Sequence, residues 1–466
     1  PFDSTRKLMT TIHQLEDGKY LVATKGAPDM LLDRVTKIEK HGEVSAFTED
    51  DRTTLMKLNK EMATQALRVL AMAYKVIDTL PETVDTDSIE HDLIFAGLVG
   101  MIDPERKEAA AAIKVAQSAG IRTIMITGDH RDTAQAIAKR LGILRPDQED
   151  GVLTGGELND ISDEELERTV ETYSVYARVS PEHKVRIVKA WQKNGKVVSM
   201  TGDGVNDAPS LKQADIGVGM GITGTEVSKG ASDMVLADDN FETIVVAVEE
   251  GRKVFANIQK AVQYLLSANF GEVMTMFVAT MAGWSILEPI HILWINLVTD
   301  VFPAIALGLE EAEADIMNHP PRGKSSNFLS NGVLPSIFYQ GFFEGGITLF
   351  VFWYATHIAN WGNPVGETMA FATLGLIQLF HAFNVKSVYK SLGTVGAFKN
   401  KLFNYAILVS AVMLLSVMVI PGLTTVFDVA ILTAEQWLFV VGAAFSIVPI
   451  VEIAKVIMRA MGMDKD

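Results

Sequence analysis

Hydrophobic and polar residues are distributed differently in the two halves of the chain. Up to about residue 260, short apolar segments alternate with polar stretches that repeat at helical spacing. Beyond that point charged residues become sparse, and long apolar stretches follow one another. This change predicts a soluble half joined to a half that is embedded in a membrane.

The first 90 residues have a mixed pattern. Residues 19–23 and 69–76 alternate apolar and polar side chains, as half-buried strands do, whereas residues 49–67 have the spacing of a helix. We therefore expect residues 1–90 to form a small α+β module.

From Leu93 onward, apolar strands alternate with polar helices. The predicted strands are residues 93–102, 121–126, 174–179, 196–200 and 216–220, and the predicted helices are residues 105–119, 132–141, 182–193 and 208–213. Apolar strands separated by helices are typical of a parallel sheet covered on both faces. We expect a doubly wound α/β domain over residues 91–253. Its acidic insert, residues 155–172, should be a surface helix in which Ser162 and Glu165 have the spacing of a capping box.

Six long apolar stretches follow the soluble half. They are residues 260–284, 289–309, 333–358, 366–385, 402–421 and 434–458, each close to the roughly 20 residues that cross a bilayer as a helix. We expect a six-helix membrane domain over residues 254–466. The basic residues of the connections and the C-terminal tail, which are Arg322, Lys324, Lys386, Lys390, Lys399, Lys401, Lys455 and Arg459, place the soluble half and the C-terminus on the cytoplasmic side.

The amino-acid composition argues against several classes of function. The net charge of −16 and the lack of a basic stripe argue against a nucleic-acid-binding surface. The chain contains no cysteine, which excludes disulfides, thiolate metal sites and cysteine nucleophiles.

Four polar loops occur where predicted strands end. They are Asp103-Pro104, Thr127-Gly128-Asp129, residues 178–184 and residues 201–207. The ligand crevice of an open α/β sheet lies beyond the carboxyl ends of its strands. The four loops should therefore gather at one site.

The residue types in these loops suit phosphoryl transfer. Asp203 and Asp207 offer hard oxygen ligands for Mg²⁺, and Gly202 and Gly204 permit a tight turn between them. Thr127 and nearby backbone N–H groups can donate to phosphoryl oxygens. Lys184 supplies a positive charge, so electrostatics and positioning would provide the catalysis.

The stretch TGDGVNDAPSLKQADIGVGMG, residues 201–221, resembles the haloacid-dehalogenase-type phosphorylation domain of P-type ATPases. The resemblance extends to Lys25-Gly26-Ala27-Pro28, which is similar to the nucleotide-domain motif whose lysine lines the ATP pocket. It implies ATP and Mg²⁺ as cofactors. The implied catalytic residues are Thr127, Gly128, Asp129, Lys184, Asp203 and Asn206, and the implied nucleotide contacts are Phe2, Lys7, Lys25, Arg68, Thr127, Asp129, Arg178 and Lys184.

One departure from the family pattern concerns the phosphorylated aspartate. The family carries it in an Asp-Lys-Thr-Gly-Thr loop, which these 466 residues do not contain. The family's Thr-Gly-Glu-Ser loop and first four membrane helices are expected upstream as well. The chain begins at Pro1 in what resembles the middle of a domain. We expect a C-terminal fragment that needs the missing N-terminal part of the same pump to form the phosphoenzyme.

The first two apolar stretches carry polar side chains that could coordinate a cation. Asn269 and Glu272 lie three residues apart, and Asn296, Thr299 and Asp300 lie close together in the second stretch. Polar residues inside membrane helices are costly and usually functional. Pro303 should favour local unwinding that frees backbone carbonyls. Hard oxygen ligands without His or Cys favour Ca²⁺ over a soft metal, and both segments resemble the calcium-pump branch of the family.

Three further polar residues lie in apolar stretches. Gln378 stands where two-site calcium pumps carry a glutamate, which suggests one strong Ca²⁺ site and a second that is weak or altered. Glu344 is expected to pair with a neighbouring helix, and Glu452 to reach water near the cytoplasmic end.

These features predict ATP-driven Ca²⁺ transport through an aspartyl-phosphate intermediate. The alternatives are the same architecture transporting Mn²⁺, Na⁺/K⁺ or H⁺, and a non-catalytic membrane subunit that binds nucleotide or a partner. The resemblance implies a multi-pass protein of a bacterial plasma membrane, with the lipid bilayer and Ca²⁺ as partners and no nucleic acid.

Overall fold

The computed structural model describes residues 2, 6–65, 67–101, 105–148, 150–323 and 326–463. The chain divides into two compact units, Pro1–Val245 and Val246–Asp466. Each unit has its own hydrophobic clusters and is described separately below.

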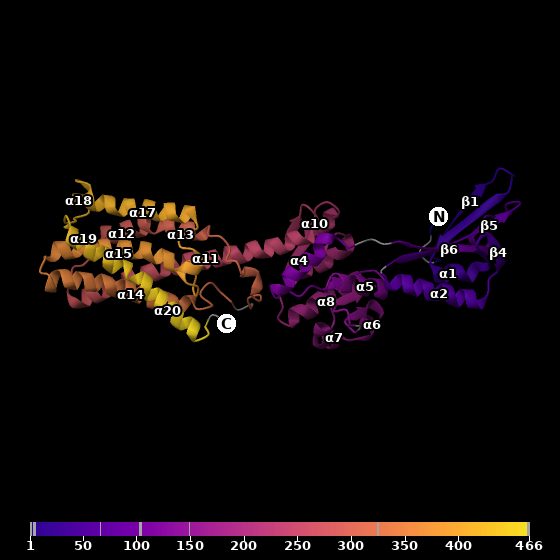
Figure 1. Ribbon diagram of the computed structural model, residues 1–466, viewed down its shortest axis with the longest axis horizontal. Coiled ribbons are helices and arrows are strands. Elements are labelled where there is room, and N and C mark those ends of the chain that lie inside the picture. The colour runs from indigo at the N-terminus through magenta and orange to yellow at the C-terminus, as the bar shows by residue number, and fades with distance from the viewer. Residues whose placement is uncertain are drawn as a thin grey trace. The chain divides into compact units, whose positions relative to one another are not determined.

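The N-terminal part of the first unit contains a six-stranded sheet in the order β1-β2-β5-β6-β3-β4. Its strands are β1 (Leu8–Gln14), β2 (Tyr20–Gly26), β3 (Val35–Lys40), β4 (Glu43–Ala46), β5 (Arg68–Ile77) and β6 (Leu93–Met101). All neighbours pair antiparallel except β3 and β6. The short helix α1 (Pro28–Leu31) and the longer α2 (Glu49–Thr64) accompany the sheet (Figure 1), and Leu31 joins Leu8, Ala71 and Phe95 in a core on one face.

Strand β6 corrects one prediction. Residues 93–102 were expected to begin the parallel sheet, but β6 pairs antiparallel with β5 and parallel with β3. The apolar pattern of residues 93–102 does not reveal which strands will be its neighbours or whether they run parallel to it. The hydrogen-bonded pairing with β5 and β3 therefore decides the sheet to which β6 belongs. The first module therefore continues past residue 90 to at least Met101.

The rest of the first unit contains two three-stranded parallel sheets. One has the order β7-β9-β8 and the other β10-β11-β12. The strands are β7 (Met125–Ile126), β8 (Val152–Thr154), β9 (Val175–Ala177), β10 (Ser199–Gly202), β11 (Ile216–Met220) and β12 (Met234–Leu236), and the accompanying helices are α4 (Lys107–Ser118), α5 (Arg131–Arg140), α8 (Pro181–Lys193), α9 (Ala208–Gln213) and α10 (Glu226–Ala231), whereas the short helix α3 (Thr86–Ile89) lies between β5 and β6 of the first sheet. Parallel pairing is confirmed, but it occurs in two sheets rather than one.

The two parallel sheets are joined by packing. Ile126 of β7 packs against a cluster that includes Met200 of β10 and Val188 of α8. The predicted strand over residues 121–126 is reduced to Met125–Ile126. Side-chain contact between β7 and β10 therefore takes the place of a continuous hydrogen-bonded ladder in the described residues.

The acidic insert forms two short helices, α6 (Gly155–Asp160) and α7 (Asp163–Thr169), followed by the 3₁₀ turn Val170–Thr172. The Ser162 hydroxyl accepts a hydrogen bond from the Glu165 amide at 3.2 Å, so Ser162 caps α7 as its spacing predicted. Within the described hydrogen bonds, the reciprocal bond from the Ser162 amide to Glu165 is absent, and the expected capping box is half formed.

Helices occur at all six predicted apolar stretches. They are α11 (Phe241–Ala282), α12 (Pro289–Trp294) with α13 (Val301–Gly308), α14 (Val333–Trp353), α15 (Asn363–Asn384), α17 (Lys401–Val419), and α19 (Ala434–Phe445) with α20 (Ile447–Ala460). Two short helices, α16 (Leu392–Val395) and α18 (Leu423–Val426), lie in the connections. Among the described residues, four segments are long and apolar enough to cross a membrane: Phe241–Ala282, Pro289–Gly308, Lys401–Val419 and Ala434–Ala460.

The helices α14 and α15 are helical as predicted, but they are less apolar than the other four. Gln340 and Glu344 interrupt the apolar sequence of α14, and Gln378 and His381 interrupt that of α15, although both helices are continuous. Sixteen of the 22 residues of α15 are buried, so this helix is shielded by its neighbours. A helix inside a bundle can carry polar groups that a lipid-facing helix cannot.

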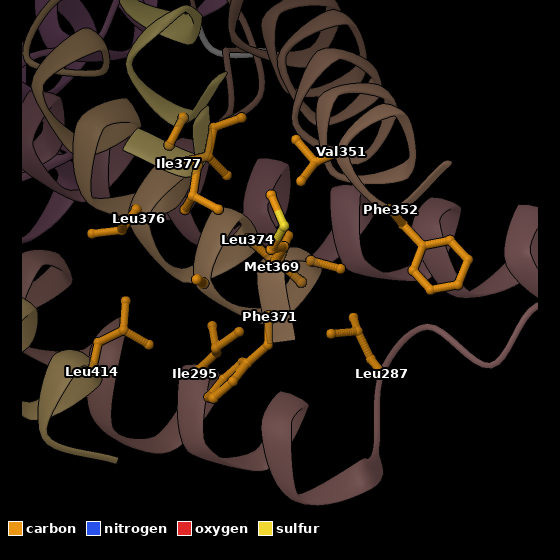
Figure 2. Close-up of a cluster of buried hydrophobic side chains, with 14 of the residues drawn as sticks. Leu287, Ile295, Val351, Phe352, Met369, Phe371, Leu374, Leu376, Ile377 and Leu414 are labelled. Carbon is orange, nitrogen blue, oxygen red and sulfur yellow. The ribbon is translucent and has the colours of Figure 1, made fainter. Parts of the chain in front are cut away.

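The core of the second unit is built around α15. Met369, Phe371, Leu374 and Ile377 have no exposed surface and lie in one cluster with Leu414 of α17 and other neighbours. Figure 2 shows Met369 and Leu374 at the centre of this cluster and Phe371 beside Ile295, with Leu287 and Val351 contributed by surrounding segments. This packing fixes the position of the polar residues on the same helix.

Candidate functional site

Three of the four predicted loops meet in the first unit. The Arg178 amide donates to the Asp129 carbonyl at 3.1 Å, and the Val179 amide donates to the Thr127 carbonyl at 3.3 Å, which joins the loops after β7 and β9. Lys184 Nζ donates to Asp207 Oδ1 at 2.5 Å and joins the loop after β9 to the loop after β10. The fourth loop, Asp103-Pro104, lies outside the described residues.

Asp207 is buried at the centre of this arrangement. Besides Lys184, its carboxylate accepts hydrogen bonds from the backbone amides of Gly204 at 3.0 Å and Asp203 at 3.2 Å. Burial acts to raise the pKa of Asp207, but these hydrogen bonds and the charge of Lys184 outweigh it and lower that pKa. Asp207 therefore holds the turn and Lys184 in place.

Gly202 is required by this packing. A Cβ atom on Gly202 would lie 2.4 Å from the Asp207 Cβ, far inside van der Waals contact. A Cβ atom on Gly204 would lie 3.5 Å from Asp207 Oδ2, which is an ordinary van der Waals contact. The first glycine of the motif is thus needed for space, whereas the second is not.

Asp203 is exposed, in contrast to Asp207. Its backbone carbonyl accepts from the Thr225 amide at 2.8 Å and from the Ser228 hydroxyl at 3.0 Å. Within the described part of the chain, its carboxylate makes no hydrogen bond or ion pair. Asn206 is also exposed. The carboxylate of Asp203 is therefore fixed by its backbone and free to bind a cation.

The loop after β7 is closed by its own side chains. The Thr127 hydroxyl donates to Asp129 Oδ2 at 3.0 Å and accepts from the Asp129 amide at 3.1 Å. The space beside Gly128, where a side chain would lie, is empty to a distance of 4 Å. Arg178 adopts a φ of 51°, which is uncommon for a residue other than glycine, and its side chain is exposed. Such backbone strain is often found at functional sites.

The predicted nucleotide residues lie in and around the six-stranded sheet. Lys25 lines a hollow of about 310 Å³ on the sheet face opposite the core, together with Met9, Met72 and Tyr74. Phe2 and Arg68 are exposed, and Lys7 has a φ of 56°. Of these residues, the structure brings only Lys25 into the hollow.

In the second unit, Glu272 of α11 is buried among amide groups. Asn296 Nδ2 donates to Glu272 Oε2 at 2.7 Å, and Gln378 Nε2 donates to Glu272 Oε1 at 3.0 Å. Three helical segments far apart in the sequence therefore converge on one carboxylate. The structure unites Glu272 and Asn296 as the sequence predicted, and it adds Gln378 to the group.

Asp300 has no exposed surface. The Tyr264 hydroxyl donates to its Oδ1 at 3.1 Å. The buried atoms Asp300 Oδ2, Thr299 Oγ1 and Gln378 Oε1 have no hydrogen-bond partner in the described structure. Buried oxygens without donors are expensive unless something else binds them.

The backbone before Asp300 departs from α-helical geometry. Ile295–Thr299 forms a π-helical turn, in which the Asp300 amide donates to the Ile295 carbonyl at 3.0 Å. Pro303 has no N–H to donate to the Thr299 carbonyl. The predicted unwinding around Pro303 is thus replaced by a widened turn just before it, and π-turns of this kind are frequent at functional sites.

Asn269 does not join this group. Its side chain is exposed, and its Nδ2 donates to the Leu265 carbonyl of its own helix at 2.8 Å. A three-residue spacing leaves the two side chains about 60° apart around the helix axis. They were therefore expected on one face, but Glu272 is buried whereas Asn269 lies at the exposed edge of that face.

Sequence reasoning missed Tyr264 and underrated Glu344. Tyr264 lies eight residues before Glu272, a spacing that keeps both on one helical face, and this signal could have identified it. Glu344 was expected to pair with a neighbouring helix. It lies 3.4 Å from His381 Nε2, but neither of its carboxylate oxygens has a hydrogen-bond partner in the described residues.

The comparisons with known proteins agree with this arrangement. A family model described as "Cation transporting ATPase, C-terminus" matches residues 284–457, and "P-type ATPase, cytoplasmic domain N" matches residues 1–108. The chain belongs to the P-type cation-transporting ATPases. Four helices within the described residues are long and apolar enough to cross a bilayer, so the chain is an integral membrane protein.

Relatives of this P-type ATPase chain include proteins named calcium-transporting ATPases. One from Bacillus cereus is 46% identical over 97% of this chain and 52% of its own length. One from Bacillus subtilis is 44% identical over 95% of this chain and 49% of its own length, and an endoplasmic reticulum-type protein from Arabidopsis thaliana is 34% identical over 98% and 50%. The chain spans about half the length of these relatives.

Proposed function

We propose that this chain forms part of a pump that uses ATP to move Ca²⁺ across a membrane through an aspartyl-phosphate intermediate. The observation that carries the proposal is the set of buried, unpartnered oxygens Asp300 Oδ2, Thr299 Oγ1 and Gln378 Oε1 near the carboxylate of Glu272. Hard oxygen atoms of this kind bind Ca²⁺ in preference to soft metals. The names of the bacterial relatives support the same ion.

The cation site would be completed by atoms from elsewhere in the natural protein. Among the described residues, no group of three or more His, Asp and Glu side chains is arranged to hold a metal ion. Gln378 donates its amide to Glu272 and leaves only a neutral oxygen for a cation. We expect one strong Ca²⁺ site, from Glu272, Asn296, Thr299 and Asp300, and a measured ratio of two Ca²⁺ per ATP would contradict this.

The phosphoryl site would combine this chain with a phosphorylated aspartate from another segment. Lys184 and Thr127 can donate to phosphoryl oxygens, and Asp207 positions Lys184. The free carboxylate of Asp203 fits Mg²⁺, which when bound supplies positive charge to the phosphate. Asn206, Gly128 and Asp129 line the same loops. The fold around them is proposed to be haloacid-dehalogenase-like.

ATP would bind over the hollow that contains Lys25. The lysine can contact phosphate, and the neighbouring Met9, Met72 and Tyr74 offer apolar surface to a base.

We propose that the nucleotide-binding part extends to about Met101, that the phosphorylation part follows it, and that six helices cross a bacterial plasma membrane with the soluble parts in the cytoplasm. Phe2, Lys7, Arg68 and Arg178 stay proposed nucleotide contacts.

The test is cation-stimulated ATP hydrolysis by the natural full-length protein in membranes. Stimulation by Ca²⁺ is expected, with loss of that stimulation in Asp300→Asn and retention in the control Glu452→Gln. Stimulation by Mn²⁺, Na⁺ or acid alone would replace Ca²⁺ with that ion. No ATP hydrolysis under any of these conditions would favour a non-catalytic membrane subunit.

A further inference from the structure

The phenol of Tyr74 is held in a fixed position on the open face of the six-stranded sheet. Tyr74 of β5 donates its hydroxyl hydrogen to Glu39 Oε2 of β3 at 2.8 Å. Strand β6 lies between β5 and β3, so the ring of Tyr74 extends across β6 to reach that carboxylate. Ala96 of β6 lines the same hollow as Tyr74, and its small side chain leaves room for the ring.

The bond to Glu39 decides what the Tyr74 oxygen can offer to a ligand. An ionised carboxylate only accepts, so the hydroxyl hydrogen of Tyr74 belongs to this bond. The hydrogen bond to Glu39, together with burial, raises the pKa of Tyr74, so the phenol keeps this hydrogen at neutral pH. Donation to a carboxylate also makes the phenol oxygen a stronger acceptor. Toward the hollow, Tyr74 therefore offers an acceptor and no donor.

The other polar side chains of the hollow do not supply an equivalent acceptor. Lys25 can only donate. The Thr24 hydroxyl is buried and lies 3.0 Å from the Thr10 hydroxyl, with which it bonds. Thr11 Oγ1 is 3.0 Å from His13 Nε2, and a hydroxyl can turn to donate or to accept. Within the described part of the chain, no Asp, Glu, Asn or Gln side chain lines the hollow.

The shape of the hollow suits a flat ring with a charged group beside it. Ala23 and Ala96 contribute small side chains, and Met9 and Met72 add flexible apolar ones. In the β2–β5 register Tyr74 lies opposite Ala23, and Lys25 lies opposite Met72. The acceptor and the positive charge are therefore two residues, or about 7 Å, apart along the strands. A nucleotide likewise has its base and its phosphates at separate positions.

We propose that Tyr74 selects the base of the nucleotide, because its oxygen accepts a hydrogen bond from the exocyclic amino group of adenine. Adenine carries a donor at position 6, whereas guanine and hypoxanthine carry an acceptor oxygen there. Two acceptors that face each other form no hydrogen bond, and each loses its water. A site built around one such bond rejects the analogue that cannot make it. The assignment rests on the proposed binding of ATP in the hollow and adds a preference for 6-amino purines.

Equilibrium binding of ATP and of inosine triphosphate to the purified natural full-length protein tests the selection. Inosine triphosphate carries the oxygen at position 6. The wild type should bind ATP at least about fivefold more tightly, the ratio expected from one hydrogen bond. Tyr74→Phe keeps the ring and removes the oxygen, so the two affinities should come within about twofold of each other. Tyr20→Phe removes a phenol hydroxyl of β2 outside the hollow and should keep the wild-type ratio.

Glu39→Gln tests the direction of the hydrogen bond. The amide of glutamine can donate to the Tyr74 oxygen, which frees the hydroxyl hydrogen for the oxygen of inosine triphosphate. The preference for ATP should therefore fall although Tyr74 is unchanged. Packing by the Tyr74 ring alone would not produce this result.

Three outcomes would contradict the selection. Equal binding of the two nucleotides by the wild type, or a wild-type ratio in Tyr74→Phe, would overturn it and leave the proposed ATP site standing. If Tyr74→Phe fails to fold, a wild-type ratio in Glu39→Gln overturns it instead. A wild type that binds neither nucleotide would refute the proposed ATP site itself, and the selection with it.

Discussion

Lys184 Nζ lies 2.5 Å from Asp207 Oδ1, while the other oxygen of Asp207 is occupied by the amides of Gly204 and Asp203. Both oxygens of this carboxylate are therefore engaged inside the protein, whereas the carboxylate of Asp203 is exposed and has no bond within the described residues. The sequence predicted both acids as Mg²⁺ ligands, and they differ in the structure: Asp207 is engaged within the loop, and we propose that the exposed Asp203 is the one that first meets Mg²⁺.

Replacing the two acids should separate these roles. Asp203→Asn should abolish Mg²⁺-dependent phosphoenzyme formation in the natural full-length protein and leave thermal stability unchanged. Asp207→Asn should lower the free energy of unfolding by about 1–3 kcal/mol, because Lys184 loses its buried partner. Normal phosphorylation of Asp203→Asn would contradict the assignment, and the melting temperatures of both variants provide the control.

Gly202→Ala should be far more damaging than Gly204→Ala. The new methyl group at Gly202 would lie 2.4 Å from the Asp207 Cβ, whereas at Gly204 the nearest atom is 3.5 Å away. Overpacking of this kind costs about 1–3 kcal/mol. Thermal denaturation of the two variants side by side checks the difference, and equal stabilities would show that the loop relaxes around Asp207.

The carboxylate of Asp239 should make the free energy of unfolding fall as the solution becomes acidic. Hydrogen bonds from the amides of Ile222 and Thr223 and from the Thr223 hydroxyl lower the pKa of Asp239 from 3.8 to about 2. Because the folded-state pKa is below the unfolded value, its stabilisation is present above pH 3.8 and is lost as the pH falls toward about 2. Acid unfolding curves of the wild type and Asp239→Asn should differ above pH 4 and converge near pH 2; parallel curves would argue against it.

Asn296→Ala and Asn269→Ala form a matched pair in the membrane unit. Asn296 binds Glu272 at 2.7 Å, so its loss should weaken Ca²⁺ activation of ATP hydrolysis at least tenfold. Asn269 is exposed and bonds only to its own helix in the described structure, so its loss should change activation less than twofold. A larger effect at Asn269 would restore it as a cation ligand.

Several features of this protein could be predicted from the sequence because they depend on local order. The long apolar stretches of the sequence predicted where the helices of the second unit lie. Helix α9 and strand β11 have the predicted bounds of residues 208–213 and 216–220. The position of Thr127, Asp203 and Asp207 after predicted strands indicated that their loops meet, and the structure brings these loops together, because parallel strands end at one edge of a sheet. Ser162 was found as a cap because capping acts over three residues.

Only the tertiary structure decided what depends on partners far apart in the sequence. The pairing of β6 with β5 moved an apolar run from the parallel sheet to the first sheet. The rotation of α11 turned Glu272 inward and left Asn269 exposed. Glu344 resembles any other glutamate in an apolar stretch of sequence, and only the packing of the helices buries it beside His381 without a hydrogen-bond donor in the described residues. The sequence by itself determined which chemical groups are present and on which elements they lie, whereas burial and long-range pairing determined which of them work together.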